Sequence, residues 1–338
     1  MDLNTLWFVL IGVLFTGYFV LEGFDFGVGA LAPFLGKTDS ERRMVINTIG
    51  PHWDANEVWL LTAGGAIFAA FPGWYATLFS GFYLALFVLL AVLIVRGVAL
   101  EFRSKREDAA WRKRWDWALS ITSILAPVLL GVAFANLLEG VPIDGSQNFV
   151  GTFWDLFSPF SVLAGLMVLS GFLYHGAMFL KIKTSDPIMG RADKLGKTLW
   201  ITTMVLALVV VGFVLFSPTM NSGKGALPTI IALLGFVAVA ISGIVNTRKD
   251  SSLPFWLTTL SIVFLSAAFF MYMFPNVMIS SLDPNYHLTI YNVASSAKTL
   301  QIMSLVAAFG VPIVLLYQGW SYWIFRKRLT EKPSDLHY

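Results

Sequence analysis

Five ionisable residues lie within or at the edge of two long apolar stretches near the start of the chain: Glu22 and Asp25 in the first, and His52, Asp54 and Glu57 in the second. Charged side chains are costly at membrane depth, and buried Asp, Glu and His residues are the usual components of a proton relay. In each stretch the two acids are three residues apart, so a helix would place both on one face. Carboxyls gathered in a medium of low dielectric constant retain protons part of the time, because burial and mutual repulsion disfavour the charged form. The pattern therefore predicts a proton-transfer site.

The elements that position these residues are expected to be membrane-spanning helices. The 338 residues are 57% hydrophobic and 13% charged, whereas about 25% of the residues in a soluble domain are charged. Runs long and apolar enough to cross a bilayer lie at 6–35, 52–72, 74–100, 117–139, 159–181, 198–217, 226–245, 254–274 and 299–325. We therefore predict an all-α integral membrane protein with nine transmembrane helices. The chain contains no cysteine, which excludes thiolate metal sites and iron–sulfur clusters.

The basic residues predict the orientation of these helices. Of the 23 Lys and Arg residues, 21 fall in the C-terminal tail and in every second connection between spans, when Arg96 is counted in the connection after the third span. Only Lys224 and Lys298 fall in the remaining connections. The side richer in Lys and Arg faces the cytoplasm. This places the N-terminus outside and the C-terminus in the cytoplasm, and it requires an odd number of spans.

We expect a single membrane domain over residues 1–338, built from two four-helix bundles and one peripheral helix. The first bundle would cover 1–139, the second 159–274, and the ninth helix 299–325. A short similarity between FVLEG (19–23) and FLYHG (172–176) supports two related halves, since membrane proteins are often built from repeats.

The orientation also orders the acids by depth. The second span begins at the cytoplasmic surface near His52, so a rise of ~1.5 Å per residue places Asp54 and Glu57 about 3 and 8 Å below that surface. The same rise along the first span places Asp25 and Glu22 about 15 and 20 Å deep. Small residues beside the acids would let the two helices approach closely; they are Gly23, Gly27 and Gly29 on one helix and Ala63, Gly64 and Gly65 on the other.

Other roles are open for these residues. The acids could cap helix N-termini or bond to neighbouring Trp and Asn side chains, and Asp54 lies in a first turn, where the helix dipole favours an acid. His52 could collect protons or simply lie at the interface. A bis-histidine haem would need two histidines at matched depth; His52 and His175 both lie towards the cytoplasmic side, but no span carries a His pair at helical spacing.

Several longer motifs resemble one known family. They are GYFVLEGFDFGVGAL (17–31), HWDANEVW (52–59), the RSK…WRKRWDW loop (103–117), GVAFANLLEGVP (131–142) and VPIVLLYQGWSYW (311–323). Together they are similar to subunit II of the cytochrome bd-type quinol oxidases, and the resemblance covers essentially the whole chain. The HWDANEVW run is its most specific part.

The resemblance implies a complex of the bacterial cytoplasmic (inner) membrane that oxidises quinol and reduces dioxygen to water. Two b-type haems and one d-type haem would belong to subunit I, which this haem-free chain would stabilise as a pseudo-symmetric heterodimer. No catalytic or metal-binding residue is then expected here. A cytoplasmic proton path at the shared interface would use Asp25 and Asp54. A structural quinone, a small single-helix accessory subunit and membrane lipid are further expected partners; nucleic acid is not.

A proton-coupled secondary transporter is the alternative, because it would use the same intramembrane carboxyls. Transporters of this kind bind substrate at interrupted helices near the middle of the membrane. The chain has prolines within its spans at Pro127, Pro228 and Pro312, but none pairs with the acids.

Overall fold

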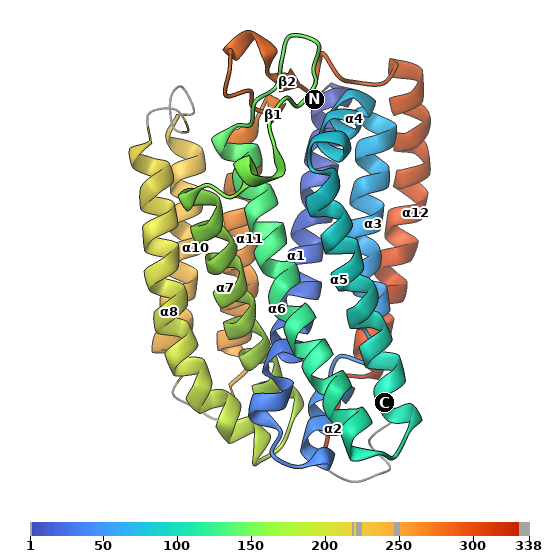
Figure 1. Cartoon of the computed structure of the whole chain (residues 1–338), viewed down its shortest axis with the longest axis vertical. Helices are drawn as coiled ribbons and strands as arrows, with labels where there is room; N and C mark the ends of the chain where they lie inside the picture. Colours follow the sequence, from blue (N-terminus) through green and yellow to red (C-terminus); the bar gives the residue numbers. More distant parts are fainter. Residues whose placement is uncertain (1, 218–219, 221–224, 247–250, 331–338) are drawn as a thin grey trace.

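The computed structural model describes residues 2–217, 220, 225–246 and 251–330. Its helices are α1 (Leu3–Leu35), α2 (Asp39–Asn47), α3 (Trp53–Ala70), α4 (Pro72–Gly81), α5 (Tyr83–Phe102), α6 (Ala109–Glu139), α7 (Pro159–Lys183), α8 (Ile188–Phe216), α10 (Ala226–Ile244), α11 (Leu253–Met273) and α12 (Ala297–Ile324). An antiparallel pair of short strands, β1 (Asn276–Met278) and β2 (Leu288–Thr289), lies at one end of the bundle, and α2 lies at the other (Figure 1). We call these the hairpin end and the α2 end.

Local signals explain where the first two helices begin. The Asp2 carboxylate accepts a hydrogen bond of 2.8 Å from the backbone N–H of Thr5 and so caps the start of α1. A reciprocal capping box between Thr38 and Glu41 starts α2. Such caps satisfy backbone N–H groups that the first turn of a helix leaves without partners. The turn between the two helices is thereby fixed, and α2 is held across the end of the bundle.

Eight helices of the described part of the chain are long and apolar enough to cross a membrane: α1, α5, α6, α7, α8, α10, α11 and α12. The chain is therefore a multi-pass membrane protein, as the composition predicts. The expected second span, 52–72, corresponds to α3, which is not among the eight because Asp54, Asn56 and Glu57 make its first turns polar. The expected third span is not one continuous helix, because α4 ends at Gly81 and α5 begins at Tyr83.

Helix α1 lies at the centre and packs against α3, α6, α7 and α11. Its closest approach is to α7, where a Cβ added to Gly27 would lie 2.9 Å from the Cα of Gly176. The expectation that small residues bring α1 and α3 together is therefore wrong for Gly27. It is also wrong for Gly64 and Gly65 of α3, since a Cβ on either would have no other atom within 4 Å. Glycine serves here to let α1 and α7 touch backbone to backbone.

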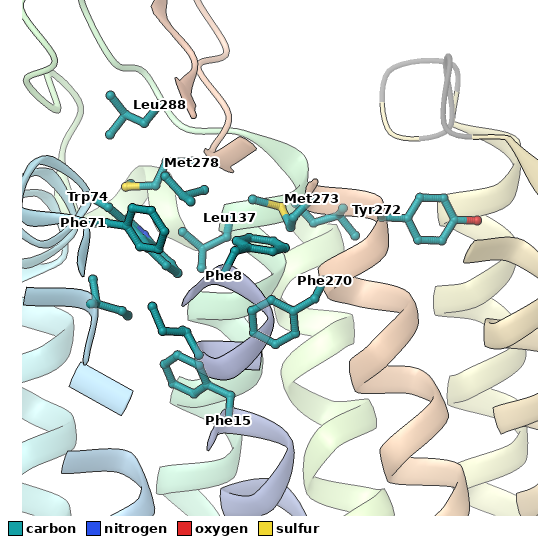
Figure 2. Close-up of a cluster of buried hydrophobic side chains, with 14 of the residues drawn as sticks. Phe8, Phe15, Phe71, Trp74, Leu137, Phe270, Tyr272, Met273, Met278 and Leu288 are labelled. Atoms are coloured by element: carbon teal, nitrogen blue, oxygen red, sulfur yellow. The ribbon is translucent and has the colours of Figure 1, made fainter. Parts of the chain in front are cut away.

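The hairpin end is closed by a cluster of aromatic and aliphatic side chains (Figure 2). Phe8 of α1 and Phe270 of α11 meet edge to face with ring centroids 5.7 Å apart, and Phe15 packs on Phe134 of α6 at 5.0 Å. Met278 and Leu288, one from each strand, are buried on top of this cluster. Close van der Waals packing of this kind is the main force between helices in lipid, so the cluster ties the hairpin to the bundle.

Helix α12 packs much less closely. Only 6% of its most apolar 18-residue window is buried, and it contacts α1 and α3 at one side of the bundle (Figure 1). At the hairpin end the indole N–H of Trp7 donates to the carbonyl of Leu300 at 3.2 Å. At the α2 end the ammonium of Lys183 donates to the carbonyl of Phe325, and the N–H of Leu329 donates to the carbonyl of Lys183 at 2.8 Å. These polar contacts, together with the packing of Leu300 and Met303 on the cluster at the hairpin end, hold α12 in place.

Candidate functional site

A buried ion pair joins α1 to α5. The guanidinium of Arg96 contacts the carboxylate of Glu22, and the two side chains are 1% and 0% exposed. The face of the Phe26 ring lies 4.6 Å from the guanidinium carbon, an arrangement that favours a cation. The prediction that Arg96 belongs to a connection is wrong, because Arg96 lies inside α5. An arginine within the apolar run VLLAVLIVRGVAL is the signal that identifies a buried cation, because intramembrane charges usually pair with one another.

Glu57 brings α3 to the same cation. Its Oε2 lies 3.8 Å from Nη1 of Arg96, and its Oε1 accepts a hydrogen bond of 3.3 Å from the hydroxyl of Tyr18. The Glu57 side chain is 17% exposed and lines a groove of about 970 Å³ whose walls are mainly apolar residues of α3, α4, α5 and α6. Glu57 therefore connects the buried pair with the outer surface of the chain.

Asp25 contacts a second set of polar side chains. Its Oδ2 accepts a hydrogen bond of 2.8 Å from Nδ2 of Asn56 on α3. Oδ1 of Asn56 in turn accepts from Nε2 of Gln318 at 3.1 Å and from the hydroxyl of Tyr322 at 2.8 Å, both on α12. All three helices thus meet at one buried amide, and Asn56, Gln318 and Tyr322 are not among the site residues predicted from the sequence.

The two sets of contacts form one cluster, because Asp25 and Glu57 both act electrostatically on Glu22. The cluster holds three carboxyls and one guanidinium. Both oxygens of Glu22, Oδ1 of Asp25 and Oε2 of Glu57 are buried, and the Arg96 guanidinium that faces Glu22 and Glu57 is their one nitrogen or hydroxyl donor among the described residues. The Glu22 carboxyl is also within hydrogen-bonding reach of the carboxyls of Asp25 and Glu57, a contact that requires a shared proton. Buried polar atoms without partners are rare in proteins and call for a reason.

The remaining expected site residues lie beside this cluster. Asp54 is exposed on the first turn of α3 and acts electrostatically on Glu57, three residues further along the same helix. His52 is buried, and its ring stacks on that of Tyr322 with centroids 4.1 Å apart. His52 thereby lies next to the α12 side of the cluster.

His175 of α7 is fully buried, and both of its ring nitrogens have partners. Nδ1 lies 2.7 Å from the hydroxyl of Thr258, and Nε2 lies 3.2 Å from the carbonyl of Val20. Neither nitrogen points to an open position where an iron atom could bind. Among the described residues, no group of three or more His, Asp or Glu side chains is arranged so that it could hold a metal ion.

At the α2 end, Glu41 forms a polar clamp between α2 and α8. Its Oε2 accepts hydrogen bonds from the Arg191 guanidinium at 2.7 Å and from the backbone N–H of Lys37 at 2.5 Å. The hydrogen bond from Arg191 lowers the pKa of the Glu41 carboxyl. The clamp fixes the connection between α1 and α3, the two helices that carry all four acids.

The fold and this cluster define a class: a multi-pass helical membrane protein in which carboxyls from two helices surround one buried arginine. Comparison with known proteins gives the family. The family profile described as cytochrome bd terminal oxidase subunit II matches residues 3–325. This chain therefore belongs to that family and is a subunit of a quinol:oxygen oxidoreductase.

Individual members of this family are similar to this chain along almost its whole length. The chain is 40% identical over 331 residues to "Cytochrome bd ubiquinol oxidase subunit 2" of Bacillus subtilis, covering 98% of each protein. It is 39% identical over 370 residues to "Cytochrome bd-I ubiquinol oxidase subunit 2" of Escherichia coli K12, covering 98% of this chain and 97% of the relative. A chain in the structure of bd oxidase from Geobacillus thermodenitrificans has a similar fold, with a TM-score of 0.76 at 19% identity and coverage of 97% and 100%. Membership of this family does not favour the transporter alternative.

Proposed function

We propose that this chain is the haem-free subunit II of a bd-type terminal oxidase, that it stabilises subunit I, and that it helps to conduct protons from the cytoplasm. The observation that supports proton conduction is the buried cluster of Glu22, Asp25 and Glu57 around Arg96. A chain that only held its partner in place would have no need of three acids at this depth.

The balance of charge explains why such a cluster can carry protons. With every acid ionised, three negative charges would face one positive charge, and an uncompensated buried charge costs several kcal/mol. Binding a proton reduces this imbalance, and releasing it restores a site ready for the next proton. Because Glu57 is partly exposed while Glu22 and Asp25 are buried, the proton would enter near Glu57 and move inward. Asp54 on the first turn of α3 and His52 beside it would collect protons from the cytoplasm.

This function requires a defined topology. We propose that α3 is the second of nine crossings, with the α2 end in the cytoplasm and the hairpin end outside, in the bacterial cytoplasmic membrane. The packing of α3 along α1 and the concentration of Lys and Arg in alternate connections support this arrangement. In the same proposal, α1 to α6 and α7 to α11 form the two halves, and α12 is the peripheral ninth helix.

The electron-transfer chemistry would take place in subunit I, which carries two b-type haems and one d-type haem and oxidises quinol. The exposed groove beside Glu57 would then face that subunit. An apolar cavity of about 220 Å³ between α6, α7 and α11 could hold the tail of a structural quinone. A small single-helix accessory subunit and bound lipid would complete the assembly.

Replacing the proposed carriers tests the proposal. Asp25→Asn and Asp54→Asn, alone and together, should slow quinol-driven oxygen consumption by about 10²-fold, the lower end of the 10²- to 10⁴-fold that a positioned proton carrier contributes. Haem content, measured from the absorption spectrum, should stay at the level of the unmodified complex. Normal turnover in a fully haem-loaded double variant would refute the relay. Loss of haem and of assembly would instead show that these acids are structural.

A further inference from the structure

The hydrogen bonds around Asp25 have only one consistent direction, and Trp59 fixes it. The indole N–H of Trp59 lies 2.8 Å from Oε1 of Gln318. An indole nitrogen can only donate, so the oxygen of the Gln318 amide must face Trp59. The Nε2 end of Gln318 must therefore face Asn56, as the distance of 3.1 Å to Oδ1 shows.

The orientation of the Asn56 amide follows from that of Gln318. Because Gln318 donates to Oδ1, the other end of the Asn56 amide must point to Asp25, and it lies 2.8 Å from Oδ2. Two further contacts agree with this orientation. The Tyr322 hydroxyl also donates to Oδ1, and Nδ2 lies 3.4 Å from the carbonyl oxygen of Leu21, which can only accept.

The consequence for Asp25 is that its two oxygens are not equivalent. Oδ2 always accepts a hydrogen bond, and a proton on Oδ2 would meet the N–H of Asn56. Oδ1 is buried and accepts no hydrogen bond from a nitrogen or hydroxyl donor among the described residues, and the carboxyl of Glu22 is within hydrogen-bonding reach of Asp25 as a group with which it can share a proton. We propose that this chain of hydrogen bonds makes Oδ1 of Asp25 the oxygen that takes up and releases the proton, with Gln318 of α12 as a positioning residue. The proposal rests on the proposed role of Asp25 in proton transfer.

This explains a feature of α12 that packing does not. The helix is barely buried, yet Gln318 is one of its two buried residues and points at the centre of the cluster. The hydrogen bonds from α12 thus reach Asp25 through the Asn56 amide. If Gln318 and Tyr322 were removed, that amide could rotate and present its oxygen to Asp25. An acceptor in that position would favour the protonated carboxyl.

The test is the pH profile of quinol-driven oxygen consumption in the assembled oxidase. The variant is Gln318→Leu with Tyr322→Phe, which removes both donors to Asn56. The control is Gln301→Leu with Tyr317→Phe, a matched pair of exposed residues on the same helix. The charged groups around Asp25 are unchanged in the variant and in the control; they are Glu22, Glu57 and Arg96. The variant removes one further titratable group that acts on Asp25, the Tyr322 hydroxyl.

The relevant limb of the pH profile is the one that disappears in Asp25→Asn. We expect this limb to move to higher pH by roughly one unit in the variant, which is the effect of losing one hydrogen bond. In the control it should stay in place. No shift, or a shift to lower pH, would overturn the inference. If the double variant does not assemble, the single variants Gln318→Leu and Tyr322→Phe decide: each should give a smaller upward shift, and two unshifted profiles would overturn it. Should Asp25→Asn itself turn over normally, the proposed function fails, and not only the orientation of Asn56.

Discussion

Removing Arg96 should destabilise the complex far more than removing Arg96 and its partner together. The Arg96→Leu variant leaves Glu22 buried without its counter-charge, and breaking a buried ion pair in this way costs about 3–5 kcal/mol. In the double variant Arg96→Leu/Glu22→Gln no uncompensated charge remains at this pair, so most of that cost should be recovered. Glu57 moderates the effect, since its carboxylate also faces Arg96 at 3.8 Å.

The assay follows the loss of the haem absorption bands of the purified oxidase at a fixed elevated temperature and gives a half-life. A half-life is the suitable measure because large membrane complexes unfold irreversibly, so that their stability is expressed as a rate. If the whole cost appears in the unfolding barrier, the Arg96→Leu half-life shortens by about two to four powers of ten. Glu22→Gln alone should shorten it less than Arg96→Leu does, because the Glu57 carboxylate still faces the cation at 3.8 Å. A double variant no more stable than Arg96→Leu would refute the reasoning, as would an Arg96→Leu complex as stable as the unmodified one.

Two further predictions concern packing and pH. Gly27→Ala should destabilise the assembled complex by about 2 kcal/mol, because the new methyl group meets the backbone of α7. The control is Gly212→Ala, whose added Cβ has no atom within 4 Å. This control should melt at the temperature of the unmodified protein. Glu41→Gln should cost about 2 kcal/mol at pH 7 through its charged hydrogen bond with Arg191. The pKa of Glu41 is lowered in the folded chain, so the ionised carboxylate stabilises the fold fully above its unfolded pKa of about 4.3 and loses this effect as the pH falls through the lower folded pKa. The melting temperatures of Glu41→Gln and of the unmodified protein should therefore converge in acid. A difference that stays constant with pH would contradict this.

Hydropathy alone predicted most of the fold. Long apolar runs can satisfy their backbone only as helices in lipid, and eight of the expected spans correspond to long helices. The interruption between α4 and α5 was not predictable, and a contact that lies beside it is remote in sequence. A Cβ on Gly81 would lie 2.6 Å from the side chain of Phe149, which reaches it from the loop between α6 and α7. Contacts of this kind leave no periodic signal.

The candidate site was predictable in its acids but not in their partners. The spacing of Glu22 and Asp25 places both on one face, and both are buried as expected. Their neighbours Arg96 and Gln318 come from helices far along the chain, and sequence spacing carries no information on such pairings. Arg96 was still visible as a charge in an apolar run, whereas Gln318 resembles any polar residue near the end of a span.

Proton uptake in a single turnover tests the central claim most directly. The fully reduced oxidase is mixed with dioxygen, and the loss of protons from solution is followed with a pH-indicator dye. We predict that Asp25→Asn slows this uptake by about 10²-fold with its haems intact, while Glu107→Gln, an exposed acid between α5 and α6, leaves the rate unchanged. Uptake at the unmodified rate in haem-loaded Asp25→Asn would contradict the account.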